Sequence, residues 1–270
     1  MQILIPTRGR TSQQLTLQSL PRELLKRTTL VCPEEEAVPL ACCWEDIDIV
    51  VEPYPNMKIA QTREWIVQTW YRAGYEKITM LDDDLVFATR IRADDWHLRP
   101  ITGEELIPEF ARVEERLGPT CPHVGFGQRQ GNNFEDGDWK WPAKMCWTLA
   151  YYLPIVAKEA RFDLGELELR EDYSVSLQLL KKGYPNAVWT GTVADDQNGH
   201  NAPGGCSTYR TSEMDDAEAL KFEALFSDYV TLNRKHGRLE PDRQQWKKAL
   251  KHGEAKRTLN TDALPRGSVG

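Results

Sequence analysis

The residues of this sequence best suited to chemistry are three consecutive aspartates, Asp82, Asp83 and Asp84. They follow a short apolar run, Ile78–Leu81, which predicts a buried strand. Open α/β sheets bind their ligands at the carboxyl ends of such strands. Because three adjacent negative charges repel one another, the triplet favours a bound cation, and Mg²⁺ and Mn²⁺ prefer these oxygen ligands. In an extended chain Asp82 and Asp84 would point to one side and Asp83 to the other. The alternative interpretation is a solvated acidic turn.

Four arginines and a glycine are candidates for binding an anionic ligand. Arg8 and Arg10 follow the first apolar run of the chain, and Arg63 lies early in an amphipathic helical pattern. A guanidinium group matches two phosphate oxygens at once, so these arginines are candidate nucleotide ligands; the alternative is ordinary surface charge. Gly204 could bring backbone N–H groups close to a diphosphate, with Arg210 nearby, although a Gly-Gly pair alone is a weak signal.

Two further groups of residues suit the acceptor side of a transfer reaction. Glu171 and Asp172 lie at the start of a predicted helix, where a carboxylate could take a proton from an attacking hydroxyl, or could simply cap the helix. Trp139 and Trp141, interleaved with lysines, could stack on a sugar ring or on a base that has left its helix. The alternative for these tryptophans is the edge of a buried core strand.

The elements that must position these residues alternate along the first half of the chain, which predicts βαβ units and a parallel sheet. The expected strands and helices there are, in order, 2–6, 12–20 (helix), 29–32, 48–51, 59–73 (helix) and 77–81. The second half is less regular. Helices are predicted there at 104–117, with Thr102 as the cap, and at 172–182, 216–236 and 241–251. Strands are predicted at 123–127, 146–153 and 187–192, and a polar loop over 125–138.

Composition indicates one large globular unit. The 270 residues carry a net charge of −7, with 40% hydrophobic and 28% charged residues. No apolar run is long enough for a membrane span, and the N-terminus lacks a signal-peptide pattern, so we expect a cytoplasmic protein. The six cysteines lack metal-binding spacing, and we expect them to be reduced thiols. From Arg234 to Arg257, however, nine Lys/Arg face three Asp/Glu, a local net charge of +6 that suits either an anionic partner or a solvated helix end.

Five short motifs resemble the GT-A class of nucleotide-sugar glycosyltransferases. They are, in order, Ile5-Pro6-Thr7-Arg8-Gly9-Arg10, Ala60-Gln61-Thr62-Arg63-Glu64, Leu81-Asp82-Asp83-Asp84, Glu171-Asp172-Tyr173 and Gly199-His200. Within that class the chain is similar to the phage TET-associated glycosyltransferases, which decorate hydroxymethylated pyrimidines in DNA. The resemblance implies an α/β GT-A fold over 1–210, with a mixed, mostly parallel sheet flanked by helices. We expect 211–257 to be a basic helical extension and 258–270 a disordered tail.

The resemblance also implies an inverting, metal-dependent transfer of a hexose or N-acetylhexosamine from a UDP-sugar to a hydroxyl group, most simply that of a 5-hydroxymethylpyrimidine in DNA. By this resemblance Asp172 would be the general base. From the chemistry of a nucleoside diphosphate, Asp84 would be the metal ligand, Asp82 would accept hydrogen bonds from the ribose hydroxyls, and Asp83 would also face the donor. His200 is a candidate second metal ligand, the alternative being a surface histidine. Since imidazole suits Mn²⁺ better than Mg²⁺, this pair favours manganese. In a phage, the site of action would be the host cytoplasm.

Three other functions remain open from the sequence. A glycan or small molecule could be the acceptor in place of DNA. A metal-dependent nucleotidyltransferase would also use clustered aspartates, but it needs a glycine-rich loop after the first strand, and 7–11 contains a single glycine. A cation-dependent binding module without catalysis would leave Asp172 and the arginines without a common purpose. Oligomeric state cannot be inferred.

Overall fold

The structure is a computed structural model of the whole chain. It describes residues 1–92, 94, 97–129, 135–143, 148–165, 167–196, 204–235, 238–241 and 244–262. The strands are β1 (Gln2–Pro6), β2 (Thr28–Cys32), β3 (Asp48–Val51), β4 (Lys77–Leu81), β5 (Leu85–Arg90), β6 (Leu98–Ile101), β7 (His123–Gln128), β8 (Trp139–Lys140), β9 (Thr148–Tyr152), β10 (Asn186–Asp196), β11 (Leu232–Lys235) and β12 (Arg238–Pro241). The α-helices are α1 (Leu15–Ser19), α2 (Arg22–Leu25), α3 (Glu34–Cys43), α4 (Ile59–Arg72), α5 (Leu106–Arg116), α7 (Leu153–Glu159), α8 (Glu171–Lys181), α9 (Ser212–Leu225) and α10 (Gln244–Asp262). Two short 3₁₀ helices, η1 (Gly103–Glu105) and η3 (Gly205–Thr208), complete the described elements.

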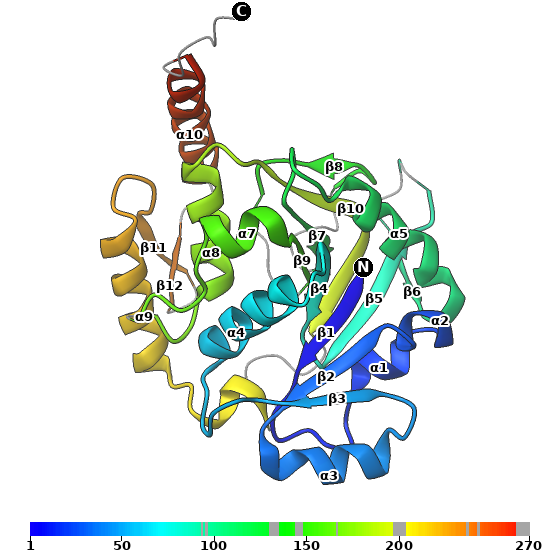
Figure 1. Cartoon of the computed structure of the whole chain (residues 1–270). Coiled ribbons are helices and arrows are strands. Elements are labelled where there is room, and N and C mark those ends of the chain that lie inside the picture. Colours follow the sequence, from blue (N-terminus) through cyan, green and yellow to red (C-terminus); the bar gives the residue numbers. More distant parts are fainter. Residues whose placement is uncertain are drawn as a thin grey trace, which may run out of the picture.

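A ten-stranded mixed sheet organises the described residues, in the order β3-β2-β1-β4-β9-β7-β10-β5-β6, with β8 paired to β10. Strands β3, β2, β1 and β4 are parallel to one another, as the alternation of apolar runs and helices predicts. Strand β9 then runs antiparallel between β4 and β7, and β5 and β6 extend the other edge. The expected α/β sheet flanked by helices is therefore confirmed (Figure 1).

Helices cover both faces of this sheet, so its central strands are buried and apolar. One face packs against α1, α2, α3 and α5, with Leu17, Leu40 and Phe110 in its core. The other packs against α4, α7 and α8, with Ile66 and Val175 in its core. The acidic triplet lies between β4 and β5, at the carboxyl ends of β1 and β4.

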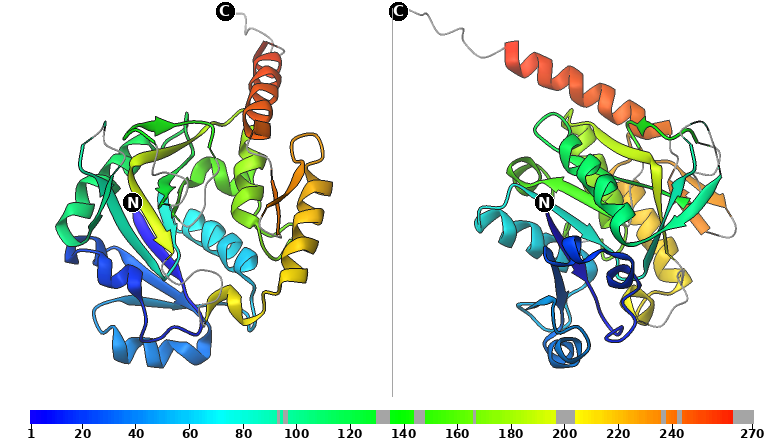
Figure 2. Two further views of the ribbon diagram at one scale, coloured as in Figure 1. Left: turned by 180° about the vertical axis from the view of Figure 1, so that it is seen from behind. Right: turned by 90° about the vertical axis from the view of Figure 1, so that its right-hand side faces the viewer.

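A third core cluster joins α9 and α10 to α8. Trp246 and Phe222 are buried in it, and Gly253 of α10 lies so close to Leu180 and Gly183 that a Cβ there would overlap the backbone. Helices α9 and α10 are thus held to the sheet domain through α8. Figure 2 shows the far end of α10 extending past the body of the protein.

Several predicted boundaries are wrong. The helix expected at 216–236 ends at Leu225 and is followed by the hairpin β11–β12, and the apolar run at 146–153 breaks at Leu153 to begin α7, which the sequence does not reveal. Strands β5 and β6 were not expected, and Thr102 gives no side-chain cap. Helix α10 continues to Asp262, past the predicted tail boundary at 258. Among the described residues, no helix combines the length and apolar composition that a membrane span requires.

Candidate active site

A cavity of about 280 Å³ opens at the carboxyl ends of β1 and β4. It is lined by the Asp82–Asp84 turn, by the chain after β1, by the first turn of α4, by the start of α8 and by the segment that begins at residue 204. Ten of the thirteen predicted site residues line it: Arg8, Arg10, Arg63, Asp82, Asp83, Asp84, Glu171, Asp172, Gly204 and Arg210. Residues separated by more than a hundred positions are thus brought to one place.

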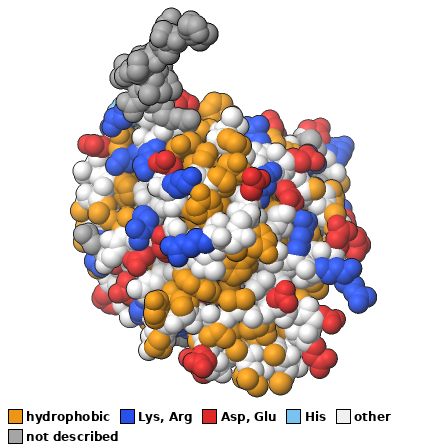
Figure 3. Space-filling view, in the orientation of Figure 1, with side chains coloured by type: hydrophobic (Ala, Val, Ile, Leu, Met, Phe, Trp, Pro, Cys, Tyr) orange, Lys and Arg blue, Asp and Glu red, His pale blue; other side chains and the backbone are white. Residues whose placement is uncertain are grey.

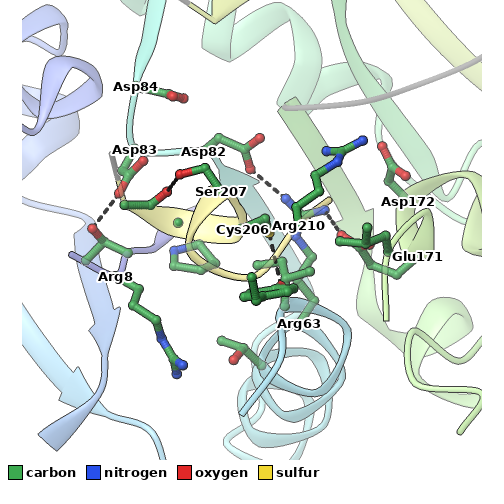
Figure 4. Close-up of a pocket in the computed structure, with 18 of the residues that line it drawn as sticks. Arg8, Arg63, Asp82, Asp83, Asp84, Glu171, Asp172, Cys206, Ser207 and Arg210 are labelled. Atoms are coloured by element: carbon green, nitrogen blue, oxygen red, sulfur yellow. Dashed lines mark hydrogen bonds and ion pairs between the residues drawn. The ribbon is translucent and has the colours of Figure 1, made fainter. Parts of the chain in front are cut away.

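The acidic triplet forms a turn between β4 and β5, so the alternation expected for an extended chain is wrong. Asp83 and Asp84 face the same cation, because Arg10 Nη1 donates to Asp83 Oδ1 and, at 2.7 Å, to Asp84 Oδ2. Asp83 also accepts a 2.5 Å hydrogen bond from the hydroxyl of Thr7. Asp82 points elsewhere and pairs with Arg63 (Figure 4).

One oxygen of Asp83 and one of Asp84 converge on the same nitrogen of Arg10. Carboxylate oxygens are the ligands that small divalent cations prefer, so this pair fits such a cation. Burial raises the pKa of Asp83, so its negative charge needs a positive partner there. The described residues contain no group of three His, Cys, Asp or Glu side chains arranged for a metal. His200, the predicted second ligand, lies outside the described residues.

Arg63 connects the acidic turn to the start of α8. Its Nη2 is 2.6 Å from Asp82 Oδ1 and its Nη1 is 2.5 Å from Glu171 Oε1. Arg63 and Glu171 are both almost completely buried, and burial raises the pKa of Glu171. A guanidinium between two carboxylates is strongly held, since removing it would leave buried charge without compensation. Arg63 therefore acts as a structural bridge, and the nitrogens that make these two contacts are not available to a phosphate.

Asp172 is not the cap of α8, so the capping alternative is wrong. The N-cap position is Arg170, whose φ of 66° puts it in the left-handed region, and the helix starts at Glu171. Asp172 lies in the first turn and lines the cavity, where Figure 4 places it beside Glu171 and across the cavity from Asp84. A carboxylate at a helix N-terminus is stabilised in its charged form by the helix dipole.

The remaining arginines are also paired with acids that the sequence did not identify. Arg8 Nη2 is 2.8 Å from Glu52 Oε2, and Arg210 Nε is 2.8 Å from Asp215 Oδ1. The Gly204 segment does reach the chain after β1, because Gly205 N donates to the carbonyl of Arg8 at 2.7 Å. The sequence signal for these partners was residue type and position: Glu52 follows a strand, and Asp215 is five residues after Arg210.

Trp139 and Trp141 are not among the residues that line the cavity, so their predicted contact with the acceptor would have to lie outside it. Trp139 pairs through β8 with the Val188–Trp189 part of β10, far along that strand from the end that reaches the cavity at Asp196. Its ring packs on Trp189 with centroids 5.4 Å apart, so it covers the edge of the core. Trp141 is 59% exposed.

Solved structures resemble the chain only distantly. Mannose-1-phosphate geranyltransferase from Thermus thermophilus is 16% identical over 72% of this chain and 57% of its own (TM-score 0.35). GalNAc-T7 with UDP, GalNAc and Mn²⁺ is 12% identical over 72% and 43% (TM-score 0.43). A putative nucleotide-diphospho-sugar transferase from Desulfovibrio desulfuricans G20 is 10% identical over 70% and 79% (TM-score 0.39). The chain thus spans about half the length of the first two.

No curated protein matches the chain. The sequence profile of one family, described as TET-Associated Glycosyltransferase, matches residues 1–204, and that range contains β1 to β10 and all of the acidic turn. The enzyme class inferred from the five motifs is therefore confirmed, and the chain belongs to the TET-associated glycosyltransferase family.

Proposed function

We propose that this glycosyltransferase is metal-dependent, takes a UDP-sugar as donor and inverts the anomeric configuration. The observation that carries the proposal is that the Asp82–Asp84 turn and Asp172 line one cavity, where Arg63 pairs with Asp82 and with Glu171, the residue before Asp172. A donor whose diphosphate lies at the acidic turn would present its sugar towards Asp172. That is the arrangement that an inverting displacement requires, with the leaving group and the base on opposite sides of the anomeric carbon.

The charge of the cavity supports a requirement for a divalent cation. Its lining contains eight Asp or Glu and five Arg, a formal charge of −3. A diphosphate entering such a cavity meets net repulsion unless positive charge enters with it. Asp84, with Asp83 beside it, would hold Mn²⁺ or Mg²⁺, which when bound neutralises charge on the leaving diphosphate. His200 stays a proposed further ligand.

In the proposed reaction the acceptor hydroxyl approaches Asp172 and gives its proton to the carboxylate as its oxygen bonds to the anomeric carbon. The bond from that carbon to the diphosphate oxygen breaks, and UDP leaves with the bonding electrons. The backbone at 204–205, close to Arg8, would cover the diphosphate. Asp82 would accept hydrogen bonds from the ribose while keeping its contact with Arg63.

We propose DNA carrying a 5-hydroxymethylpyrimidine as the acceptor. Helix α10 supplies exposed Lys247, Lys248 and Lys251, and it starts close to the segment that carries Asp172, since the rings of Trp246 and Tyr173 lie 6.4 Å apart. Figure 3 shows basic side chains on the face where α8 meets α10. Phosphates bound there would leave the modified base to enter the cavity, which requires that it leave the helical stack.

The test is a UDP-release assay with a panel of UDP-sugars, Mn²⁺, and hydroxymethylated or unmodified DNA of the same sequence. We expect release only with hydroxymethylated DNA and Mn²⁺. Asp172→Asn should keep UDP binding and lose ~10²–10⁴ in rate, the usual contribution of a general base. Asp84→Asn should lose Mn²⁺-dependent UDP binding, while an exposed control, Asp46→Asn, should behave as wild type. Transfer to a free glycan instead would exclude the DNA acceptor, and release of pyrophosphate would indicate a nucleotidyltransferase.

A further inference from the structure

Helix α9 lies outside the part of the chain that the family profile matches, yet it contacts the segment that carries Asp172. Glu218, in the middle of α9, is 1% exposed. Its Oε2 accepts hydrogen bonds from the backbone N–H groups of Glu168, at 2.9 Å, and Leu169, at 3.1 Å. A buried carboxylate that accepts two consecutive backbone N–H groups fixes both the position and the direction of that backbone.

A second contact holds the next residue of the same segment. Arg170 is not a glycine but has a φ of 66°, a conformation that persists only where the surroundings impose it. Its guanidinium donates to the backbone carbonyl of Asp215, at 3.3 Å, in the first turn of α9. The carboxylate of Asp215 in turn holds Arg210 in the cavity lining. Helix α9 therefore holds 168–170 from one side, immediately before Glu171 and Asp172.

The other side of this segment is fixed by Arg63 through Glu171. Asp172 thus projects from a backbone that is held at both flanks, one by the sheet domain and one by α9. A general base works only when its oxygen stays within hydrogen-bond reach of the acceptor hydroxyl, and a displacement of about 1 Å can cost ~10²-fold in rate.

We propose that Glu218 is a positioning residue for the transfer reaction: it orients the segment that carries Asp172 without touching substrate itself. This inference rests on the proposed role of Asp172 as the base. It makes α9 an integral part of the catalytic unit, so that the 1–204 segment alone would retain the donor side of the cavity without a fixed base. The carboxyl group acts through its hydrogen bonds, so an amide oxygen in the same place should serve.

The test compares three substitutions of Glu218 with a control on the same helix. Glu218→Ala removes both acceptors, Glu218→Asp withdraws them while keeping the charge, and Glu218→Gln keeps an oxygen that can accept both hydrogen bonds. The control is Glu223→Ala, because Glu223 also accepts a backbone N–H, from Leu232 at 3.1 Å, but at the β11 side of α9. All four are measured in the full chain for kcat, for UDP affinity with Mn²⁺, and for hydrogen exchange at 168 and 169.

We expect Glu218→Ala to lower kcat by ~10–100-fold with UDP affinity within about twofold of wild type, and to speed exchange at both amides. Glu218→Asp should fall between Ala and wild type, and it serves as the decisive variant if the Ala protein does not fold. Glu218→Gln should retain most of the rate, and Glu223→Ala should lose stability but not kcat. A folded Glu218→Ala or Glu218→Asp with wild-type kcat and wild-type exchange would overturn the inference. If wild type transfers to no acceptor, the proposed function fails, whereas unchanged exchange at 168 and 169 would refute the positioning contact by itself.

Discussion

Gly204 should be the residue of the cavity least tolerant of a methyl group. Its φ of 95° and ψ of 176° lie in a region that side chains other than glycine essentially never adopt. A Cβ there would lie 2.6 Å from Cγ of Arg10 and 2.9 Å from the carbonyl oxygen of Arg8. The first neighbour is a flexible side chain that can move, but the second is backbone held by the hydrogen bond from Gly205. Replacement of Gly204 by alanine therefore combines backbone strain with a steric overlap that only a backbone shift relieves.

The magnitude follows from these two contributions. The backbone region costs ~1–3 kcal/mol for a residue other than glycine, and overpacking costs ~1–3 kcal/mol. If the segment moved away from Arg8, the overlap would be relieved, but the hydrogen bond from Gly205 to the Arg8 carbonyl, worth ~1 kcal/mol, would be lost. We expect Gly204→Ala to lower the free energy of unfolding by about 2–4 kcal/mol. Because Arg10 must move, UDP affinity with Mn²⁺ should fall as well.

Gly205→Ala provides the matched control next in the chain. Its φ of 57° is left-handed, but the nearest atom to a Cβ would be Nη2 of Arg10 at an ordinary 3.8 Å. The cost should then be the conformational one alone, ~1–2 kcal/mol. Urea unfolding of both variants, with and without UDP and Mn²⁺, measures the difference. If Gly204→Ala is no less stable than Gly205→Ala and binds UDP as wild type, the close packing of 204 on the chain after β1 is refuted.

Two further predictions concern DNA and pH. Replacing Lys247, Lys248 and Lys251 together with alanine should raise the KM for hydroxymethylated DNA. It should also reduce the slope of log KM against log salt concentration by up to ~0.9 per lost phosphate contact. An unchanged slope would show that these lysines of α10 do not bind DNA phosphates. His123 is fully buried against Tyr151, and burial lowers its pKa to about 3. The pKa of His123 in the folded state is therefore below its unfolded value of ~6.5, so the unfolded state takes up the proton first as pH falls. The free energy of unfolding should then decrease as pH falls from ~6.5 towards 3, by up to ~1.4 kcal/mol per pH unit. His123→Phe should flatten urea-unfolding stability between pH 7 and 5, and a slope equal to wild type would contradict this.

Local patterns were sufficient to place the strands of the parallel half of the sheet along the chain. The apolar runs of β1 to β4 and the amphipathic pattern of α4 predict the parallel half of the sheet almost residue by residue. They fail where an apolar run continues across a change of structure, as at Leu153, where β9 gives way to α7. They fail again at Leu232–Lys235, which pairs in a hairpin with β12 although its pattern favours a continuing helix.

The chemistry of the site was predictable by residue type but not by partner. The sequence shows that Arg10, Arg63 and the acidic triplet are unusual, yet Arg10 meets Asp83 across 73 positions and Arg63 meets Glu171 across 108. Such pairings depend on how the strands are ordered, which no local pattern contains. The packing of Trp139 on Trp189 could not be predicted for the same reason, since it depends on the pairing of β8 with β10.

These pairings change what the arginines of the cavity can do. Each of the four predicted as phosphate ligands already has a carboxylate partner, so a diphosphate must either use other N–H groups of these guanidinium groups or take over a contact. Arg63 is the least able to exchange partners, because the buried Glu171 and the partly exposed Asp82 would lose their compensation together. Arg10 is the best placed to exchange, since the oxygens that hold it at Asp83 and Asp84 are the ones that a divalent cation would use. In the proposed function, cation binding at Asp84 would release the Arg10 guanidinium towards the phosphates, so cation and donor should bind with positive coupling.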